Sequence, residues 1–209
     1  MSVSKAQICH WLDRIYLNIE ENKDHLTQLD EHTGDADHGI NLSRGFQKVK
    51  EKVDTLPTNA DIGLVFKTVA MALISNVGGA SGSLYGSFFL KGFFPANQKQ
   101  ELTDEEFVKV FAFGVSGIKE RGKAELGDKT MIDLWVPVLE TMQNELRNGK
   151  TIQQMADDML RTATLAREKS KFLVSKKGRA SLMGTHTVGM IDPGVESSYL
   201  IIKSLHSIL

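Results

Sequence analysis

Hydrophobic residues recur along most of this chain at the spacing of amphipathic helices. Between positions 8 and 19, isoleucine and leucine return every three or four residues, so we predict one helix over residues 4–29. The same spacing predicts further helices over residues 38–53, 61–76, 84–93, 103–121, 129–147, 151–171 and 192–208. No stretch alternates apolar and polar residues over a useful length, which argues against strands. We therefore expect an all-α fold, with a single domain over residues 1–209 built as a bundle of eight antiparallel helices.

Residues typical of helix ends support several of these boundaries. Residues 103–106 and 151–154 each place a threonine at the cap position and Glu or Gln three positions later, which is the arrangement of a capping box. Asp192 and Pro193 suit the cap and the first turn of the last helix. Pro95 is expected to end the helix over residues 84–93, because proline disrupts a helix interior.

Composition narrows the classes of function. The chain has 25 basic and 26 acidic residues, and this balance argues against a non-specific nucleic-acid binder. A single cysteine, Cys9, cannot form an internal disulfide, and the charged N-terminal stretch lacks the apolar run of a signal peptide, so we expect a cytoplasmic protein. Residues 68–90 carry no charge, but the glycines and serines in their centre would break a helix in lipid. We therefore expect two buried helices there and no membrane span.

Carboxylates are concentrated in the stretch TGDADHG, residues 33–39. Asp35 and Asp37 stand two positions apart, so in an extended segment their side chains point to the same side, and Asp30 lies just upstream. Three acidic groups so close repel one another, and a hard cation bound by oxygen ligands, Mg²⁺ or Ca²⁺, would relieve that repulsion. The alternative is a helix-capping turn with solvated acids.

A second candidate feature is the glycine-rich stretch before residue 84. Gly79, Ala80 and Ser81 are small enough for main-chain N–H groups to approach a phosphate near a helix N-terminus. The stretch matches neither a dinucleotide-binding fingerprint nor a Walker loop. A plain glycine turn between packed helices is the alternative.

Two further polar islands lie later in the chain. Residues 121–131 contain two glycines and end at Met131, and taken alone they are explained by an ordinary helix connection. The basic turn over residues 176–179, which reads KKGR, lies in the long loop over residues 171–192. Its Arg179 could neutralise a phosphate, although a solvated basic turn is the alternative. Acids for a metal, small residues for phosphates and an arginine together suit a metal-bound nucleotide.

Four stretches in this order resemble the nucleotide-binding L subunit of dihydroxyacetone kinase. They read GDADHGINLSRGF, NVGGASGSLYGSFF, RGKAELGDKTMIDLWVPV, and KKGRAS with a later DPG. The resemblance covers nearly the whole chain and implies a barrel of eight antiparallel helices with a nucleotide site at one end. It also implies that Asp30, Asp35 and Asp37 hold two Mg²⁺ ions. Together with Gly79 of the glycine-rich stretch, the residues implied to surround ADP are His38, Asn41, Ala80, Ser81, Gly122, Met131, Arg179, Asp192, Pro193 and Gly194.

The resemblance further implies a division of labour among subunits. Because the chain has no room for a substrate-binding K domain, it is most similar to the form linked to the phosphotransferase system. There an M subunit phosphorylates bound ADP in place, and the phosphoryl group passes to dihydroxyacetone on a separate K subunit, giving dihydroxyacetone phosphate. We assign no catalytic nucleophile to this chain and expect that group on the partner. A subunit of a related ketose kinase, or a non-catalytic nucleotide-binding regulator, remains an alternative.

The chain departs from the family after residue 181. Where relatives often read YLGERSIGH, residues 182–190 read LMGTHTVGM. The glycines are kept, but the aromatic residue, the Glu-Arg pair and the histidine are missing. We expect this loop to face a partner subunit.

Overall fold

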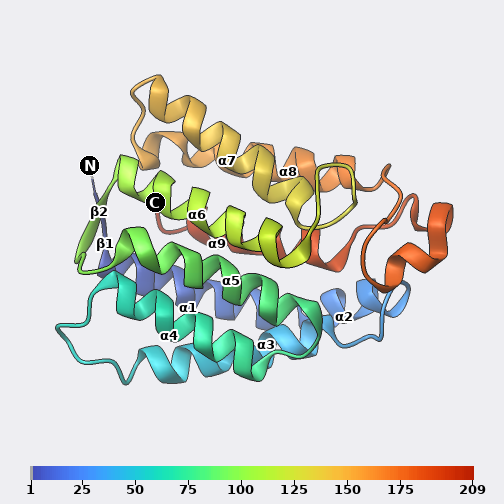
Figure 1. Cartoon of the computed structure of the whole chain (residues 1–209), viewed down its shortest axis with the longest axis horizontal. Coiled ribbons are helices and arrows are strands. Elements are labelled where there is room, and N and C mark those ends of the chain that lie inside the picture. Colours follow the sequence, from blue (N-terminus) through green and yellow to red (C-terminus); the bar gives the residue numbers. More distant parts are fainter. Residues whose placement is uncertain (1) are drawn as a thin grey trace.

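The structure, a computed structural model, describes residues 2–209 and is almost entirely helical (Figure 1). Its α-helices are α1 (Lys5–Glu21), α2 (Lys23–Glu31), α3 (His38–Val53), α4 (Ile62–Asn76), α5 (Gly79–Ala96), α6 (Asp104–Gly122), α7 (Ile132–Arg147), α8 (Ile152–Ser170) and α9 (Pro193–His206). The other elements of the described residues are the 3-10 helix η1 (Arg179–Thr187) and the strands β1 (Ser2–Ser4) and β2 (Glu101–Thr103).

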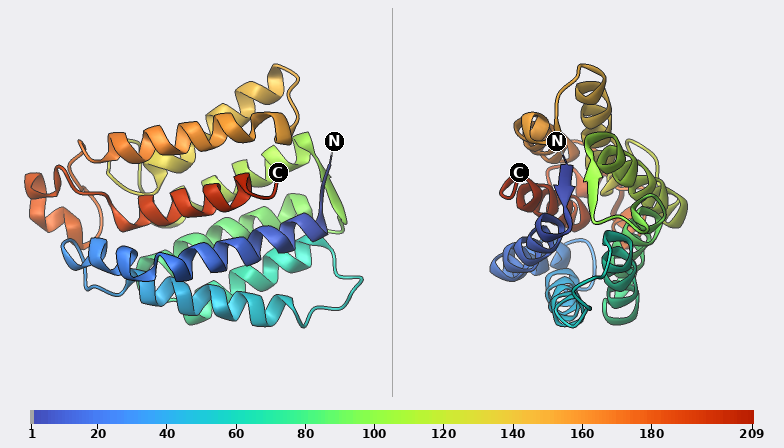
Figure 2. Two further views of the ribbon diagram at one scale, coloured as in Figure 1. Left: turned by 180° about the vertical axis from the view of Figure 1, so that it is seen from behind. Right: turned by 90° about the vertical axis from the view of Figure 1, so that its left-hand side faces the viewer.

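The eight long helices form a closed ring around one hydrophobic core. Helix α1 packs on α3, each helix from α3 to α8 packs on the next, and α9 returns to α1. Figure 2 shows this ring from its end, and neighbouring helices run antiparallel. The predicted all-α barrel of eight helices is therefore confirmed. The short helix α2 lies outside the ring, at the end of the barrel that also carries η1 (Figure 1).

The single helix predicted over residues 4–29 is wrong, because the chain breaks at Asn22. Asn22 has φ −105° and ψ 12°, and its side-chain Nδ2 donates a hydrogen bond to the carbonyl of Asn18 over 2.8 Å. Such local side-chain bonds compete with a continuing helix. The apolar stripe resumes beyond the break at the buried Leu26, so periodicity alone did not reveal it. The new direction lets α2 carry the chain to the open end of the barrel.

The helix predicted over residues 84–93 begins earlier and ends later than expected. Helix α5 starts at Gly79 and includes Pro95, which lies in its last turn and does not end it. Glycine permits the early start, since a Cβ at Gly82 would lie 2.5 Å from the carbonyl oxygen of Val77. The first turn of α5 thus packs directly against the end of α4, and the glycine-rich stretch is mostly helix.

The sequence did not predict the small sheet. Strand β1 pairs antiparallel with β2, with Ser2 opposite Thr103. Three residues are too few for alternation to be visible. Both predicted capping boxes are present, because the side chains of Thr103 and Thr151 each accept a hydrogen bond from the main chain three residues later. Within residues 2–209, no helix is long and apolar enough to cross a membrane.

Candidate nucleotide and metal site

A cavity of about 360 Å³ lies at the end of the barrel that carries α2 and η1. It is bordered by the loop before α3, the starts of α3, α5 and α9, the turn before α7 and the start of η1. The predicted site residues that line it are Asp30, Asp35, Asp37, His38, Gly79, Ala80, Ser81, Met131, Arg179, Asp192, Pro193 and Gly194. Segments from both halves of the chain therefore meet at one place.

Two predicted residues do not line this cavity. Gly122 lines an adjoining cavity of about 250 Å³ that shares Ala80 and Met131 with the first. Asn41 is buried, and its Oδ1 accepts a hydrogen bond from Nη2 of Arg44 over 2.7 Å. A Cβ placed on Gly78 would lie 3.1 Å from Nδ2 of Asn41, so the Asn41 side chain packs closely against the turn before α5.

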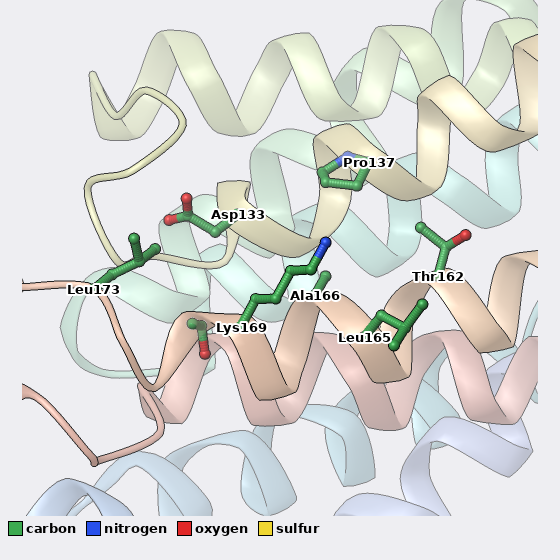
Figure 3. A pocket seen from close by; sticks show the side chains of 8 residues that line it. Asp133, Pro137, Thr162, Leu165, Ala166, Lys169 and Leu173 are labelled. Carbon is green, nitrogen blue, oxygen red and sulfur yellow. The ribbon is translucent and has the colours of Figure 1, made fainter.

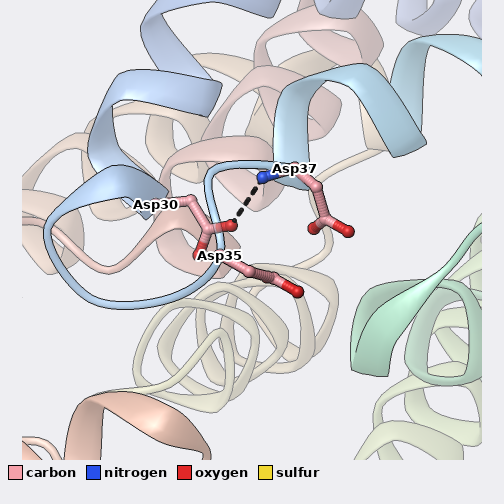
Figure 4. Close-up of side chains that lie close together, drawn as sticks. All are labelled: Asp30, Asp35 and Asp37. Atoms are coloured by element: carbon pink, nitrogen blue, oxygen red, sulfur yellow. Dashed lines mark hydrogen bonds between the residues drawn. The ribbon is translucent and has the colours of Figure 1, made fainter.

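The three predicted metal ligands are close together, as Figure 4 shows. Asp30, Asp35 and Asp37 each offer one carboxylate oxygen, and these oxygens all lie within 4.8 Å of one another. Oδ2 of Asp30 accepts hydrogen bonds from the main-chain N–H groups of Asp37 (3.1 Å) and His38 (3.3 Å). The carboxylate of α2 thereby fixes the start of α3.

The backbone brings these acids together differently from the prediction. The segment is bent and not extended, because Ala36 adopts a left-handed conformation with φ 58°. Such a conformation is unfavourable for alanine, and strained residues of this kind cluster at functional sites. Gly34 completes the bend, since a Cβ there would lie 2.0 Å from Oδ1 of Asp30. The loop therefore packs against the very carboxylate that it helps to position.

The chemistry of this cluster fits a hard divalent cation. All its ligands are carboxylate oxygens, which Mg²⁺ prefers over nitrogen or sulfur. Nη1 of Arg179 lies 2.5 Å from Oδ2 of Asp35, so a positive group already faces one of the acids. Asp30 has one oxygen engaged by main-chain amides, which orients the other. These residues could hold a metal at the mouth of the cavity.

Other groups of the cavity suit phosphate. The helices α3, α5 and α9 all begin at its wall, at His38, Gly79 and Pro193. Helix N-termini carry a partial positive charge, which favours anions, and the N–H groups at the start of α5 have no side-chain cap. Lys177 and Arg179 also line the cavity and add two formal positive charges. Acids and anion-binding groups in one cavity suit a metal-bound polyphosphate better than either component alone.

A buried chain of hydrogen bonds joins the same three helices. Nε2 of His38 lies 3.0 Å from Oγ of Ser197, which lies 2.7 Å from the hydroxyl of Tyr85. That hydroxyl also contacts Oγ of Ser198 at 2.9 Å. Burial lowers the pKa of His38 to about 4 and raises the pKa of Tyr85. His38 is thus a neutral residue that holds the helix starts together at pH 7.

Asp192 is the N-cap of α9, as predicted. Its Oδ1 accepts a hydrogen bond from the main-chain N–H of Val195 over 3.0 Å. Burial nevertheless raises the pKa of Asp192 to about 6. The effect of burial is larger than the opposite effects of the main-chain hydrogen bonds and of the positive charge of Lys129, which lower the pKa. The carboxylate is therefore held in an environment that penalises its charge.

Sequence reasoning missed several residues of the site. The cavity is also lined by Thr33, Gly34, Gly78, Leu84, Lys177, Gly178 and Ala180. Lys177 and Gly178 stood in the basic turn already singled out for Arg179, so a signal was present. Leu84 reads as an ordinary core residue. Tyr85 and Ser197 carry no local signal, because only the packing of α5 on α9 brings them into contact.

Known proteins are similar to this chain in sequence over nearly its whole length. Residues 32–207 match the DAK2 domain. The chain is 40% identical to the ADP-binding subunit DhaL of the PEP-dependent dihydroxyacetone kinase of Escherichia coli (strain K12), over 98% of this chain and 97% of that protein. It is 35% identical to the ADP-binding subunit DhaL of the PTS-dependent dihydroxyacetone kinase of Lactococcus lactis, over 93% of each.

A solved structure shares the fold at low sequence identity. The dihydroxyacetone kinase from C. freundii, in complex with AMP-PNP and Mg²⁺, superposes with a TM-score of 0.76 at 21% identity. The match covers 99% of this chain and 34% of that one. The same barrel therefore forms about a third of a longer kinase chain.

Proposed function

The chain belongs to the DAK2 domain family, and we propose that it is the ADP-binding subunit of a phosphoenolpyruvate-dependent dihydroxyacetone kinase. The observation that carries this proposal is the single cavity in which three carboxylates, three helix N-termini and Arg179 meet. In a complex with a metal-bound nucleoside diphosphate, the carboxylates would bind the metal, and the helix N-termini and the arginine would bind the phosphates. In this proposal residues 1–209 act as one nucleotide-binding domain.

The proposed cofactors are ADP and two Mg²⁺ ions. Asp30, Asp35 and Asp37 would hold the metals, which when bound neutralise phosphate charge and polarise phosphate oxygens. The glycine-containing start of α5, which no side chain caps, would bind the phosphates through main-chain N–H groups. The adjoining cavity with Gly122 and Met131 would receive the adenine, because its walls are more apolar and it opens from the same place.

The chain itself would contribute position and charge. Phosphoryl transfer depends mainly on orientation and on stabilisation of charge, so a nucleophile from the protein is not required. Arg179 lies beside Asp35 and would add positive charge where the phosphoryl group leaves. The neutral His38 would hold the starts of α3 and α9 in register. The acceptor hydroxyl and its activating group would come from the partner.

Two partners complete the proposed reaction. A phosphotransferase-system M subunit would phosphorylate the bound ADP, and a K subunit would present dihydroxyacetone to the resulting γ-phosphoryl group. The near full-length alignment with free-standing L-type subunits supports this form over the fused kinases. A cytoplasmic location is part of the same proposal.

The nucleotide content of the purified protein tests the proposal. The protein is denatured, the supernatant is separated by ion exchange, and magnesium is assayed in parallel. We expect near-stoichiometric ADP with Mg²⁺, and formation of dihydroxyacetone phosphate only when both partners are added. Protein that is empty and does not bind Mg·ADP would contradict the proposal. Nucleotide binding without transfer in the presence of both partners would instead indicate a regulatory module.

A further inference from the structure

Lys129 is a buried lysine in the turn between α6 and α7. Only 2% of its surface is exposed, and its backbone is left-handed with φ 57°. Its Nζ donates to the carbonyl oxygens of Leu173 (3.0 Å) and Thr187, and lies 3.5 Å from that of Lys171. An ammonium group has three protons to donate, and here main-chain carbonyls face all of them.

Burying this ammonium group costs free energy. Burial disfavours the charged form of a lysine and lowers the pKa of Lys129, while the nearby Asp192 opposes that shift. An apolar side chain of similar length would avoid the cost. However, residues 171–178 join α8 to η1 without regular structure, so their carbonyl groups need donors from elsewhere. Lys129 supplies a donor to two of them, at Lys171 and Leu173.

Packing contributes little to holding this segment on its outer side. Phe172 is 78% exposed, and Leu173 borders a cavity of about 280 Å³ between α7 and α8 (Figure 3). Hydrogen bonds hold the segment instead. Oγ1 of Thr187 accepts from the N–H of Ser175 over 3.0 Å, and the N–H of Lys176 donates to the carbonyl of Asp128 over 3.0 Å.

The segment held in this way enters the nucleotide cavity. Lys177, Gly178 and Arg179 follow directly and all line it, and Arg179 reaches Asp35. On the other side of Lys129, Met131 lines both cavities. One buried ammonium group therefore ties the wall that carries Met131 to the segment that carries Arg179.

We propose that Lys129 is a positioning residue of the nucleotide site, which holds residues 171–176 in place and thereby positions Lys177 and Arg179 in the wall of the cavity, against the phosphates. This inference rests on the proposed function, because a nucleotide is what the segment would cover. We expect the fixed segment to slow the dissociation of the nucleotide. In the proposed function the nucleotide stays bound through many cycles of phosphorylation, so slow dissociation is required.

The test compares Lys129→Met with Lys203→Met. Methionine keeps the length of the buried side chain and removes its charge and donors, whereas Lys203 is an exposed lysine on α9 outside the segment and the cavity. The release of fluorescent mant-ADP is followed by stopped flow in the presence of Mg²⁺. We expect Lys129→Met to release it about tenfold faster, since several hydrogen bonds are lost, and Lys203→Met to stay near the wild-type rate. Equal release rates for Lys129→Met and wild type would overturn the inference.

A double mutant separates positioning from general damage. If Lys129 acts through the segment that carries Arg179, Lys129→Met should change release much less in an Arg179→Ala background. Fully additive effects would indicate a purely structural lesion and would overturn the inference. If Lys129→Met does not fold, the release of mant-ADP is measured for Thr187→Val instead. This variant removes the hydroxyl that accepts a hydrogen bond from the N–H of Ser175, so it should also speed release, and an unchanged rate would overturn the inference. A wild-type protein that does not bind Mg·mant-ADP would refute the proposed function itself, and this inference with it.

Discussion

Nη1 of Arg179 lies 2.5 Å from Oδ2 of Asp35, and this ion pair connects η1 to the loop between α2 and α3. The two side chains are 64% and 47% exposed, so the pair adds at most about 1 kcal/mol to the free energy of unfolding. The ion pair matters mainly because it brings two distant segments of the chain together. It brings a cation from the late segment of the chain to the acids from the early segment, at the cavity that both line.

Asp35→Asn should separate binding from folding. Loss of one carboxylate should weaken Mg·ADP binding roughly 10- to 100-fold, while the free energy of unfolding changes by at most about 1 kcal/mol, because the ion pair that is lost is the exposed one with Arg179. Calorimetric titration and thermal unfolding measure the two quantities. Asp54→Asn, at an exposed acid paired with Lys50 on α3, is the matched control and should change neither. Wild-type affinity in Asp35→Asn would remove this residue from the metal site.

Gly34→Ala should disturb the metal site without altering any ligand. The added Cβ would lie 2.0 Å from Oδ1 of Asp30, so either the carboxylate or the loop must shift. We expect Mg²⁺ affinity to fall by at least about tenfold, in the range of changes to groups that support a metal ligand. Gly149→Ala is the control, because it strains a left-handed turn in open space. It should cost about 1 kcal/mol of stability and leave Mg²⁺ binding unchanged. Equal Mg²⁺ affinity in both variants would contradict the assigned role of Asp30.

Tyr85→Phe should loosen the buried connection between the helix starts. The change removes the hydroxyl that contacts Ser197 and Ser198, and leaves both buried serines with fewer partners. We expect a loss of about 1 to 2 kcal/mol in the free energy of unfolding, measured by urea denaturation, and weaker Mg·ADP binding. Tyr16→Phe, at a partly buried tyrosine of α1, is the control. An unchanged stability in Tyr85→Phe would show that the chain of hydrogen bonds is dispensable.

Asp192 should make stability depend on pH in the nucleotide-free protein. Its pKa rises from the ordinary 3.8 to about 6 on folding, so the folded state holds the proton more tightly. The stabilisation from this group is present below pH 3.8 and is lost as pH rises through 6. Asp192→Asn keeps the helix cap and removes the charge, so above pH 6 it should be more stable than wild type by about 2 to 3 kcal/mol.

Unfolding curves between pH 4 and pH 7.5 measure this difference. Asp61→Asn, at the cap of α4 away from the cavity, controls for the effect of an amide at a helix cap. The prediction fails if the curves of Asp192→Asn and wild type run parallel over this range. Lys129 and Asp133 face Asp192 and are left unchanged in both proteins.

The comparison of sequence and structure shows which features are local. Helices α3, α4, α6, α8 and α9 lie within one or two residues of their predicted bounds, because apolar periodicity and capping residues act over a few neighbours. The predictions failed where the pattern was ambiguous. Asn22 broke a helix whose apolar stripe continued beyond it, and Gly79 began a helix where the glycines indicated a loop.

The sequence by itself determined the barrel helices and the closeness of Asp35 and Asp37, since both follow from short separations along the chain. Only the tertiary structure decided that Arg179 and Asp192 complete the same cavity, that Tyr85 meets Ser197, and that Lys129 is buried beneath the late loop. These relationships join distant segments. Their cause is the closure of the ring, in which α9 packs on α1 and brings the late loop over the early acids, and no local pattern records that contact.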